Sequence, residues 1–152
     1  MAGIGNLFCG DDGFGPEVAR RLVASGPLPE HVRVVDYGIR GMHLAYDLLD
    51  GYDALVILDA VPGPGEPGDI GVLQIGERDL GVGDFDPHGM APVAVLASLA
   101  DLGGELPPTY VVGCRPGDVS EGIGLSGPVE AAIPAAMAAV RTLLTERVGV
   151  MA

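Results

Sequence analysis

The sequence has few basic residues. Eight arginines and no lysine stand against 21 aspartates and glutamates, which gives a formal net charge of −13 at pH 7. The arginines are scattered along the chain and form no run. Because a field of this sign repels the phosphate backbone, the composition argues against a nucleic-acid partner.

Cysteine and long apolar runs are also scarce. Cys9 and Cys114 are the only cysteines, and without a C-x-x-C pair a structural thiolate metal site is not expected. The chain start lacks the charged, apolar and small-residue order of a secretory signal. The longest apolar run, around residues 131–140, is interrupted by Pro134 and is too short to span a bilayer. We therefore expect a cytoplasmic protein with two free thiols and no membrane partner.

Aromatic residues make up only 5% of the chain, with no tryptophan, although 48% of the residues are hydrophobic. The core is therefore expected to consist of aliphatic side chains. A chain of 152 residues has the size of one ordinary domain, and no repeat, linker or low-complexity tract divides it. We expect residues 1–152 to form a single domain.

Short aliphatic runs alternate with helix-like stretches, which is typical of a parallel sheet covered by helices on both faces. Three β-branched runs read as buried parallel strands at the centre of the sheet: Val32–Gly38, Ala54–Val61 and Thr109–Arg115. The segment Ile70–Gly76 contains glycines and follows a loop rich in proline and glycine, which favours an edge strand. The predicted fold class is α/β, a single domain with a mostly parallel, twisted sheet of about five strands.

Four segments show helical spacing of their apolar residues: Pro16–Ala24, Met42–Leu49, Ala91–Leu102 and Gly127–Val148. In the first of these helices, Pro16 is expected at the first position. Its predicted core-facing residues are Val18, Ala19, Leu22 and Val23. Pro134 is expected to kink the last helix or to end its first part. Only two residues precede the first glycine of the chain, so the first strand is expected to be a stub or to lack its beginning.

The glycine-rich segment "GIGNLFCGDDGFGP", residues 3–16, contains the adjacent carboxylates Asp11 and Asp12. It resembles the start of a dinucleotide-binding turn, and Asp36 stands where a ribose would be held, but Phe8 replaces the third glycine of that pattern. Two carboxylates would also repel a pyrophosphate at this helix N-terminus. A Rossmann-like nucleotide-binding module stays open as an alternative, and helix capping is the purely structural role for the two aspartates.

Asp59 ends the apolar run of a predicted central strand, at the carboxyl edge where open α/β sheets bind ligands. His88 lies in the turn "DPHGM" before a predicted helix. Together with Asp12, these residues would bring two carboxylates and an imidazole to one edge of the sheet, a donor set suited to zinc, nickel or iron. Cys9 and His88 could instead serve as a nucleophile and its base.

Several short segments occur in a characteristic order and at characteristic separations: "GIGN", "DDGFG", "VILDAV", "DPHGM", "VGCRP" and "GIGLSGPVEAAIP". In this respect the sequence resembles, over essentially its whole length, the hydrogenase maturation proteases. Members of this family are endopeptidases that trim the C-terminal extension of the large subunit of a nickel-iron hydrogenase. The resemblance implies a hydrolase whose partner is the large-subunit precursor.

The family binds metal through an acidic residue in the glycine turn, an aspartate after the third strand and a histidine in a later loop. The matching positions are Asp12, Asp59 and His88, which the resemblance implies as both catalytic and metal-binding residues. It further implies that the metal is the nickel already placed in the precursor, with zinc as another possible divalent ion. Asp11 is then expected to support the turn or to orient Asp12. A non-catalytic nickel or hydrogenase assembly chaperone is the remaining alternative.

Overall fold

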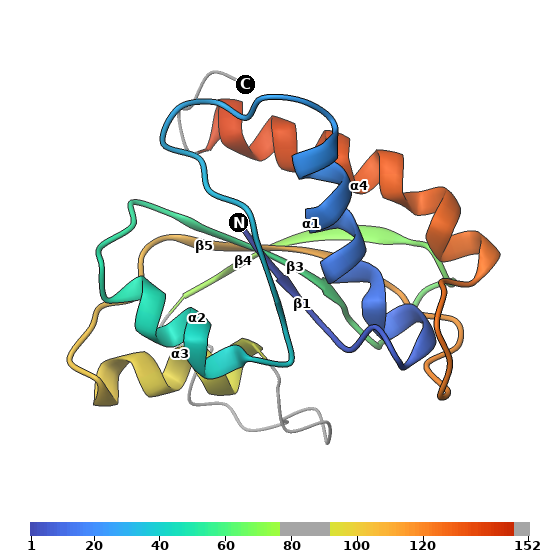
Figure 1. The fold of residues 1–152 in the computed structure, drawn as a ribbon, viewed down its shortest axis with the longest axis horizontal. Coiled ribbons are helices and arrows are strands. Elements are labelled where there is room, and N and C mark those ends of the chain that lie inside the picture. The colour runs from blue at the N-terminus through green and yellow to red at the C-terminus, as the bar shows by residue number, and fades with distance from the viewer. Residues whose placement is uncertain (77–91, 148–152) are drawn as a thin grey trace.

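A five-stranded sheet of order β2-β1-β3-β5-β4 lies at the centre of the computed structural model, which describes residues 1–76 and 92–147 (Figure 1). Its strands are β1 (Ala2–Ile4), β2 (Val35–Gly38), β3 (Leu55–Ala60), β4 (Ile70–Ile75) and β5 (Thr109–Cys114). All neighbouring pairs are parallel except β4 and β5, which are antiparallel. The predicted α/β class with one mostly parallel sheet is confirmed.

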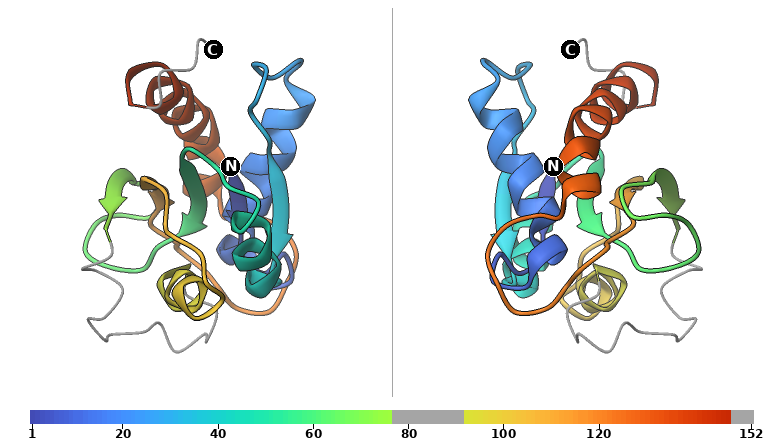
Figure 2. Two further views of the ribbon diagram at one scale, coloured as in Figure 1. Left: turned by 90° about the vertical axis from the view of Figure 1, so that its left-hand side faces the viewer. Right: turned by 90° about the vertical axis from the view of Figure 1, so that its right-hand side faces the viewer.

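Helices cover both faces of this sheet (Figure 2). The helices are α1 (Phe14–Ala24), α2 (Gly41–Leu48), α3 (Pro92–Asp101) and α4 (Gly127–Glu146), and a short 3-10 helix, η1 (Gly10–Gly13), precedes α1. Helices α1 and α4 enclose one largely aliphatic core against the sheet, and α2 and α3 enclose another on the opposite face. Within the described residues, no helix is long and apolar enough to cross a membrane.

The first strand is short but central. β1 has three residues, and its Ala2 lies opposite Val35 of β2 on one side and Ile57 of β3 on the other. Because β1 occupies this place, the prediction that Val32–Gly38 lies in the middle of the sheet is wrong, and β2 is an edge strand. The β-branched pattern misleads here because Val32 and Val34 pack against the core from the segment before the strand.

Two further details differ from the sequence-based expectations. Helix α1 begins at Phe14, so Pro16 is its third residue, and Val23 is 56% exposed although it was predicted to face the core. Helix α4 runs through Pro134 for 20 residues without ending there. Its neighbours Ile133 and Ala136 are fully buried, and this packing offsets the hydrogen bond that the proline cannot donate. The edge position predicted for β4 is confirmed.

Candidate active site at the carboxyl edge of the sheet

The glycines of the N-terminal turn bring one backbone segment against another. A Cβ atom on Gly5 would collide with the carbonyl oxygen of Asp12, and one on Gly15 would collide with the carbonyl oxygen of Leu58. Gly5 also has a φ of 144°, which L side chains rarely adopt. The glycines that resemble a dinucleotide turn therefore allow η1 and the start of α1 to pack closely on β1 and β3.

Asp12 lies in η1 and is half-buried. Its Oδ2 atom accepts a hydrogen bond from the backbone N–H of Asn6 at 2.9 Å. Within the part of the chain that the structure describes, its Oδ1 atom has no hydrogen-bond donor. One oxygen is thus held by the backbone, and the other is available to a ligand.

Asp59 is the fifth residue of β3 and is 9% exposed. Side chains alternate along a strand, so Asp59 shares the sheet face of Ile57, which belongs to the core beneath α2 and α3. Strand β3 contacts η1, and the backbone of Leu58, next to Asp59, packs on Gly15. The elements that carry Asp12 and Asp59 therefore meet at the carboxyl ends of β1 and β3.

His88, the third predicted ligand, lies outside the described residues. Among residues 1–76 and 92–147, no group of three histidine, cysteine, aspartate or glutamate side chains is arranged to hold a metal ion. The assignment of Asp12, Asp59 and His88 as one site therefore stays a prediction. So does the pairing of Cys9 with His88. Both Cys9 and Cys114 are free thiols, as expected.

Asp11 has a structural role that the sequence does not reveal. Its side chain is fully buried and accepts four hydrogen bonds of 2.7–2.9 Å from the segment between β5 and α4. The donors are the backbone N–H groups of Gly117, Asp118 and Ser126 and the Ser126 hydroxyl. Burial raises the pKa of the Asp11 carboxyl, but the hydrogen bonds from Asp118, Ser126 and Gly117 outweigh it and leave this pKa below its usual range.

Backbone hydrogen bonds join the same two segments. The Gly10 N–H donates to Gly122 at 2.9 Å, the Gly122 N–H donates to Phe8 at 2.7 Å, and the Asp11 N–H donates to Asp118 at 2.8 Å. Asp11 is therefore a clamp between the turn that carries Asp12 and the segment of residues 117–126. It does not cap η1 from the N-cap position, which Cys9 occupies without a side-chain hydrogen bond.

Arg115 performs a similar task for the chain that follows Asp59. Its guanidinium donates to the carbonyl oxygens of Val61 at 2.6 Å and Pro64 at 2.9 Å. The Arg115 N–H also donates to the carbonyl oxygen of Asp69 at 2.9 Å. The end of β5 thus holds the loop of residues 61–69, through which the chain leaves β3.

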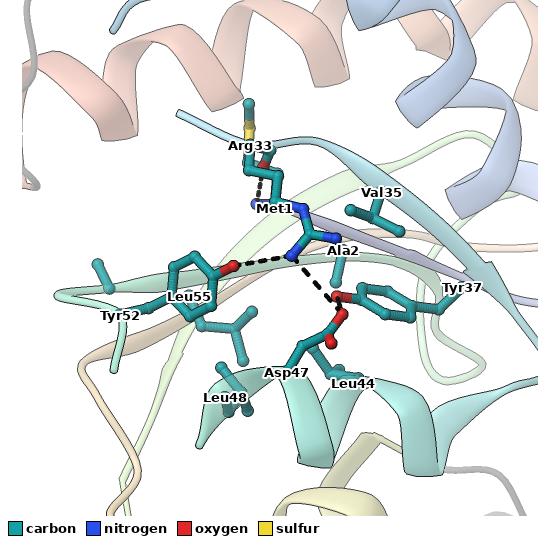
Figure 3. A pocket seen from close by; sticks show the side chains of 11 residues that line it. Met1, Ala2, Arg33, Val35, Tyr37, Leu44, Asp47, Leu48, Tyr52 and Leu55 are labelled. Atoms are coloured by element: carbon teal, nitrogen blue, oxygen red, sulfur yellow. Dashed lines mark hydrogen bonds and ion pairs between the residues drawn. The ribbon is translucent and has the colours of Figure 1, made fainter. Parts of the chain in front are cut away.

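A small cavity of about 30 Å³ lies near the opposite, amino end of β1 and β3 (Figure 3). There Arg33 donates to the Tyr52 hydroxyl at 2.9 Å, and the Tyr37 hydroxyl donates to Asp47 at 2.5 Å. Burial raises the pKa of Tyr37, and the Asp47 carboxylate raises it further. A cavity of this size has room for about one water molecule, and its polar groups bind one another, so we do not regard it as a substrate site.

Residues 16–143 match the family model described as hydrogenase maturation protease. This chain belongs to the hydrogenase maturation protease family. The hydrogenase expression/formation protein HupD of Rhizobium leguminosarum bv. viciae is 33% identical over 100% of this chain and 77% of its own length. For the hydrogenase 2 maturation protease of Escherichia coli (strain K12), the identity is 32% over 96% of this chain and 90% of that protein.

The hydrogenase maturation protease fold is also seen in solved structures. The hydrogenase maturating endopeptidase HybD from E. coli has a TM-score of 0.85 and 30% identity, covering 99% of this chain and 93% of that one. A hydrogenase 2 maturation peptidase from the Thaumarchaeota archaeon SCGC_AB-539-E09 has a TM-score of 0.73 and 33% identity, covering 95% of this chain and 96% of that one. These similarities confirm the predicted family and the enzyme class, a peptidase.

Membership of the hydrogenase maturation proteases argues against one of the alternatives that the sequence left open. A Rossmann-like nucleotide-binding module is not supported, and the Asp36 carboxylate expected to hold a ribose accepts the Gly38 N–H at 2.9 Å. The family match includes Asp59 and His88 but begins after Asp12. The assignment of Asp12 stays a prediction.

Proposed function

We propose that this protease removes the C-terminal extension of a nickel-iron hydrogenase large-subunit precursor in the cytoplasm, and that it recognises the nickel already inserted there. The contact between η1 and β3 is the observation that carries the proposal, because it joins the elements of Asp12 and Asp59 at the carboxyl edge of the sheet. The names of the relatives, such as the E. coli hydrogenase 2 maturation protease, support the choice of substrate.

The residues are chemically suited to nickel. Asp12 offers an oxygen without a donor among the described residues, and Asp59 offers a second carboxylate. His88 would add an imidazole, and carboxylate and imidazole ligands together suit a borderline divalent ion. The net charge of −13 favours a cationic centre over an anionic one.

In this proposal the nickel is part of the substrate. Asp12, Asp59 and His88 bind it and so hold the precursor with one peptide bond next to a water molecule. Water then hydrolyses that bond, leaving a carboxylate on the mature subunit and an amino group on the released extension. The metal can lower the pKa of a bound water or polarise the carbonyl oxygen.

The test is incubation of the protein with nickel-loaded and with nickel-free large-subunit precursor, followed by mass measurement. We expect loss of the C-terminal extension from the nickel-loaded precursor only. Equal cleavage of both precursors would contradict nickel recognition. Binding of the nickel-loaded precursor with no change in its mass would instead indicate the assembly chaperone.

A further inference from the structure

The sheet has no side chains in the row beside Asp59. Asp59 of β3 pairs with Gly113 of β5, and Gly113 pairs with Gly71 of β4. Residues paired across neighbouring strands point to the same face of a sheet. On the face of α2 and α3, the row that starts at the Asp59 carboxylate therefore continues to the edge of the sheet over two glycines.

The local fold does not require glycine at Gly71. Neither Gly71 nor Gly113 has a positive φ. A Cβ atom on Gly71 would meet no atom of the described residues within 4 Å, whereas one on Gly113 would lie 2.9 Å from Cγ2 of Val61. Glycine weakens a strand by up to about 1 kcal/mol relative to a good strand former, and inside a strand it often marks close approach of a ligand. Gly71 thus leaves space that none of the described residues fills.

That space is a surface hollow of about 210 Å³. Leu73 and Val111, which pair with each other, line it together with Val61, Pro64, Asp69 and Arg115. Leu73 is 59% exposed, so the apolar wall is accessible. The volume is below the 300–1,000 Å³ of typical small-molecule pockets and is suited to a side chain on a short extended peptide.

We propose that this glycine-floored hollow is a substrate subsite, which receives an apolar side chain of the precursor next to the bond that is cut. The inference rests on the proposed function, since it places the substrate peptide in the row of Asp59. A peptide held at Asp59 and extended across β5 passes Val61, whose side chain covers Gly113, and places an apolar side chain over Gly71, where it covers Leu73 and Val111. Gly71 is then a specificity-determining residue, because any larger residue there fills the subsite.

The experiment compares Gly71→Phe with Gln74→Phe on the nickel-loaded precursor. Gln74 belongs to the same strand, does not line the hollow, and pairs with Tyr110, which lies in the core of the opposite face, so its phenylalanine adds bulk on the other side of the sheet. We expect Gly71→Phe to raise KM and lower kcat/KM by at least about 10-fold, as a lost apolar side-chain contact does. Gly71→Ala should have a smaller effect, and Gln74→Phe should match the wild type.

Thermal unfolding of each variant separates a filled subsite from a misfolded protein. If Gly71→Phe lowers Tm, Gly71→Val replaces it, because valine is a good strand former. Cleavage by the folded Gly71 variant at the wild-type kcat/KM would overturn the subsite and leave the protease function standing. If the wild type cleaves neither precursor, the proposed function fails. The affinity of each variant for the nickel-loaded precursor then tests the subsite. Weaker binding by the Gly71 variant than by Gln74→Phe supports it, and equal binding refutes it.

Discussion

The two ends of the parallel strands use polar groups in different ways. At the amino end, Arg33, Tyr37, Asp47 and Tyr52 bind one another around a cavity with room for about one water (Figure 3). At the carboxyl end, Asp12 keeps an oxygen without a donor from the described residues. Polar groups that bind one another contribute to stability, whereas an acceptor without a donor from the described residues can bind a substrate. The cavity at the amino end is therefore not where we expect chemistry.

Removal of the open carboxylate should have the largest effect. Asp12→Asn keeps the size of the side chain and an oxygen that can accept the Asn6 N–H. It removes the charge that would bind nickel, so we expect cleavage of the nickel-loaded precursor to fall by at least about 100-fold, the equivalent of about 3 kcal/mol. The fold-change is obtained from the initial cleavage rates of the variant and the wild type, measured by mass spectrometry.

Asp50→Asn is the matched control, because it removes one negative charge from an exposed residue just after α2. Its cleavage rate should equal that of the wild type. If Asp12→Asn cleaved the precursor at the wild-type rate in the same assay, Asp12 would not be part of the active site.

Replacement of Asp11, the neighbour of Asp12, should reduce the stability of the fold rather than act directly on cleavage. Asp11→Ala leaves the N–H groups of Gly117, Asp118 and Ser126 without their acceptor, and we expect it to lower the free energy of unfolding by about 3 kcal/mol. Asp11→Asn should be destabilising too, since its amide N–H₂ would face N–H or O–H donors. Urea unfolding measures both variants.

The pH dependence of unfolding gives an independent check on Asp11. Its pKa is lower in the folded protein than in the unfolded chain, so its stabilising effect is complete above the unfolded pKa of about 3.9. The effect is lost as the pH falls through the folded pKa. The stability difference between wild type and Asp11→Asn should therefore shrink in acid, and a difference that is constant down to pH 2 would show that the charge of Asp11 does not matter.

The closed network at the amino end should have the smallest effect. Tyr37→Phe removes the hydrogen bond to Asp47, which Arg33 still approaches at 3.8 Å. We expect a loss of about 1 kcal/mol in the free energy of unfolding and an unchanged cleavage rate. Reduced cleavage by a fully folded Tyr37→Phe variant would break the distinction between the two ends of the sheet.

The local pattern was sufficient to predict most elements but not where they lie in the sheet. The runs around Val56 and Val112 have the predicted strand form, and the proline- and glycine-rich loop before Ile70 correctly indicated an edge strand. The same β-branched pattern placed Val32–Gly38 at the centre, although β2 is at the edge. Strand order depends on which segments cross over one another, and the composition of a single strand does not indicate which strands lie beside it.

For the site, the sequence placed Asp59 at a strand end because an apolar run that stops at a carboxylate is a local signal. The family resemblance assigned Asp12 to the metal and Asp11 to the support of the turn, but the sequence did not show which groups Asp11 binds. The partners of Asp11 lie 106–115 residues away, so only the folded chain shows them. The role of Arg115 is likewise visible only in the folded chain, where its guanidinium donates hydrogen bonds to the carbonyl oxygens of Val61 and Pro64.

By itself the sequence determined the alternation of strands and helices, the glycine turn and the family resemblance, because all of these are written in short-range patterns of residue type. Only the tertiary structure decided which of two neighbouring aspartates is buried as a clamp, which strand is at the edge, and that Gly113 and Gly71 stand in the row of Asp59. The physical reason is that hydrogen-bond satisfaction and strand register are set between segments far apart in the chain.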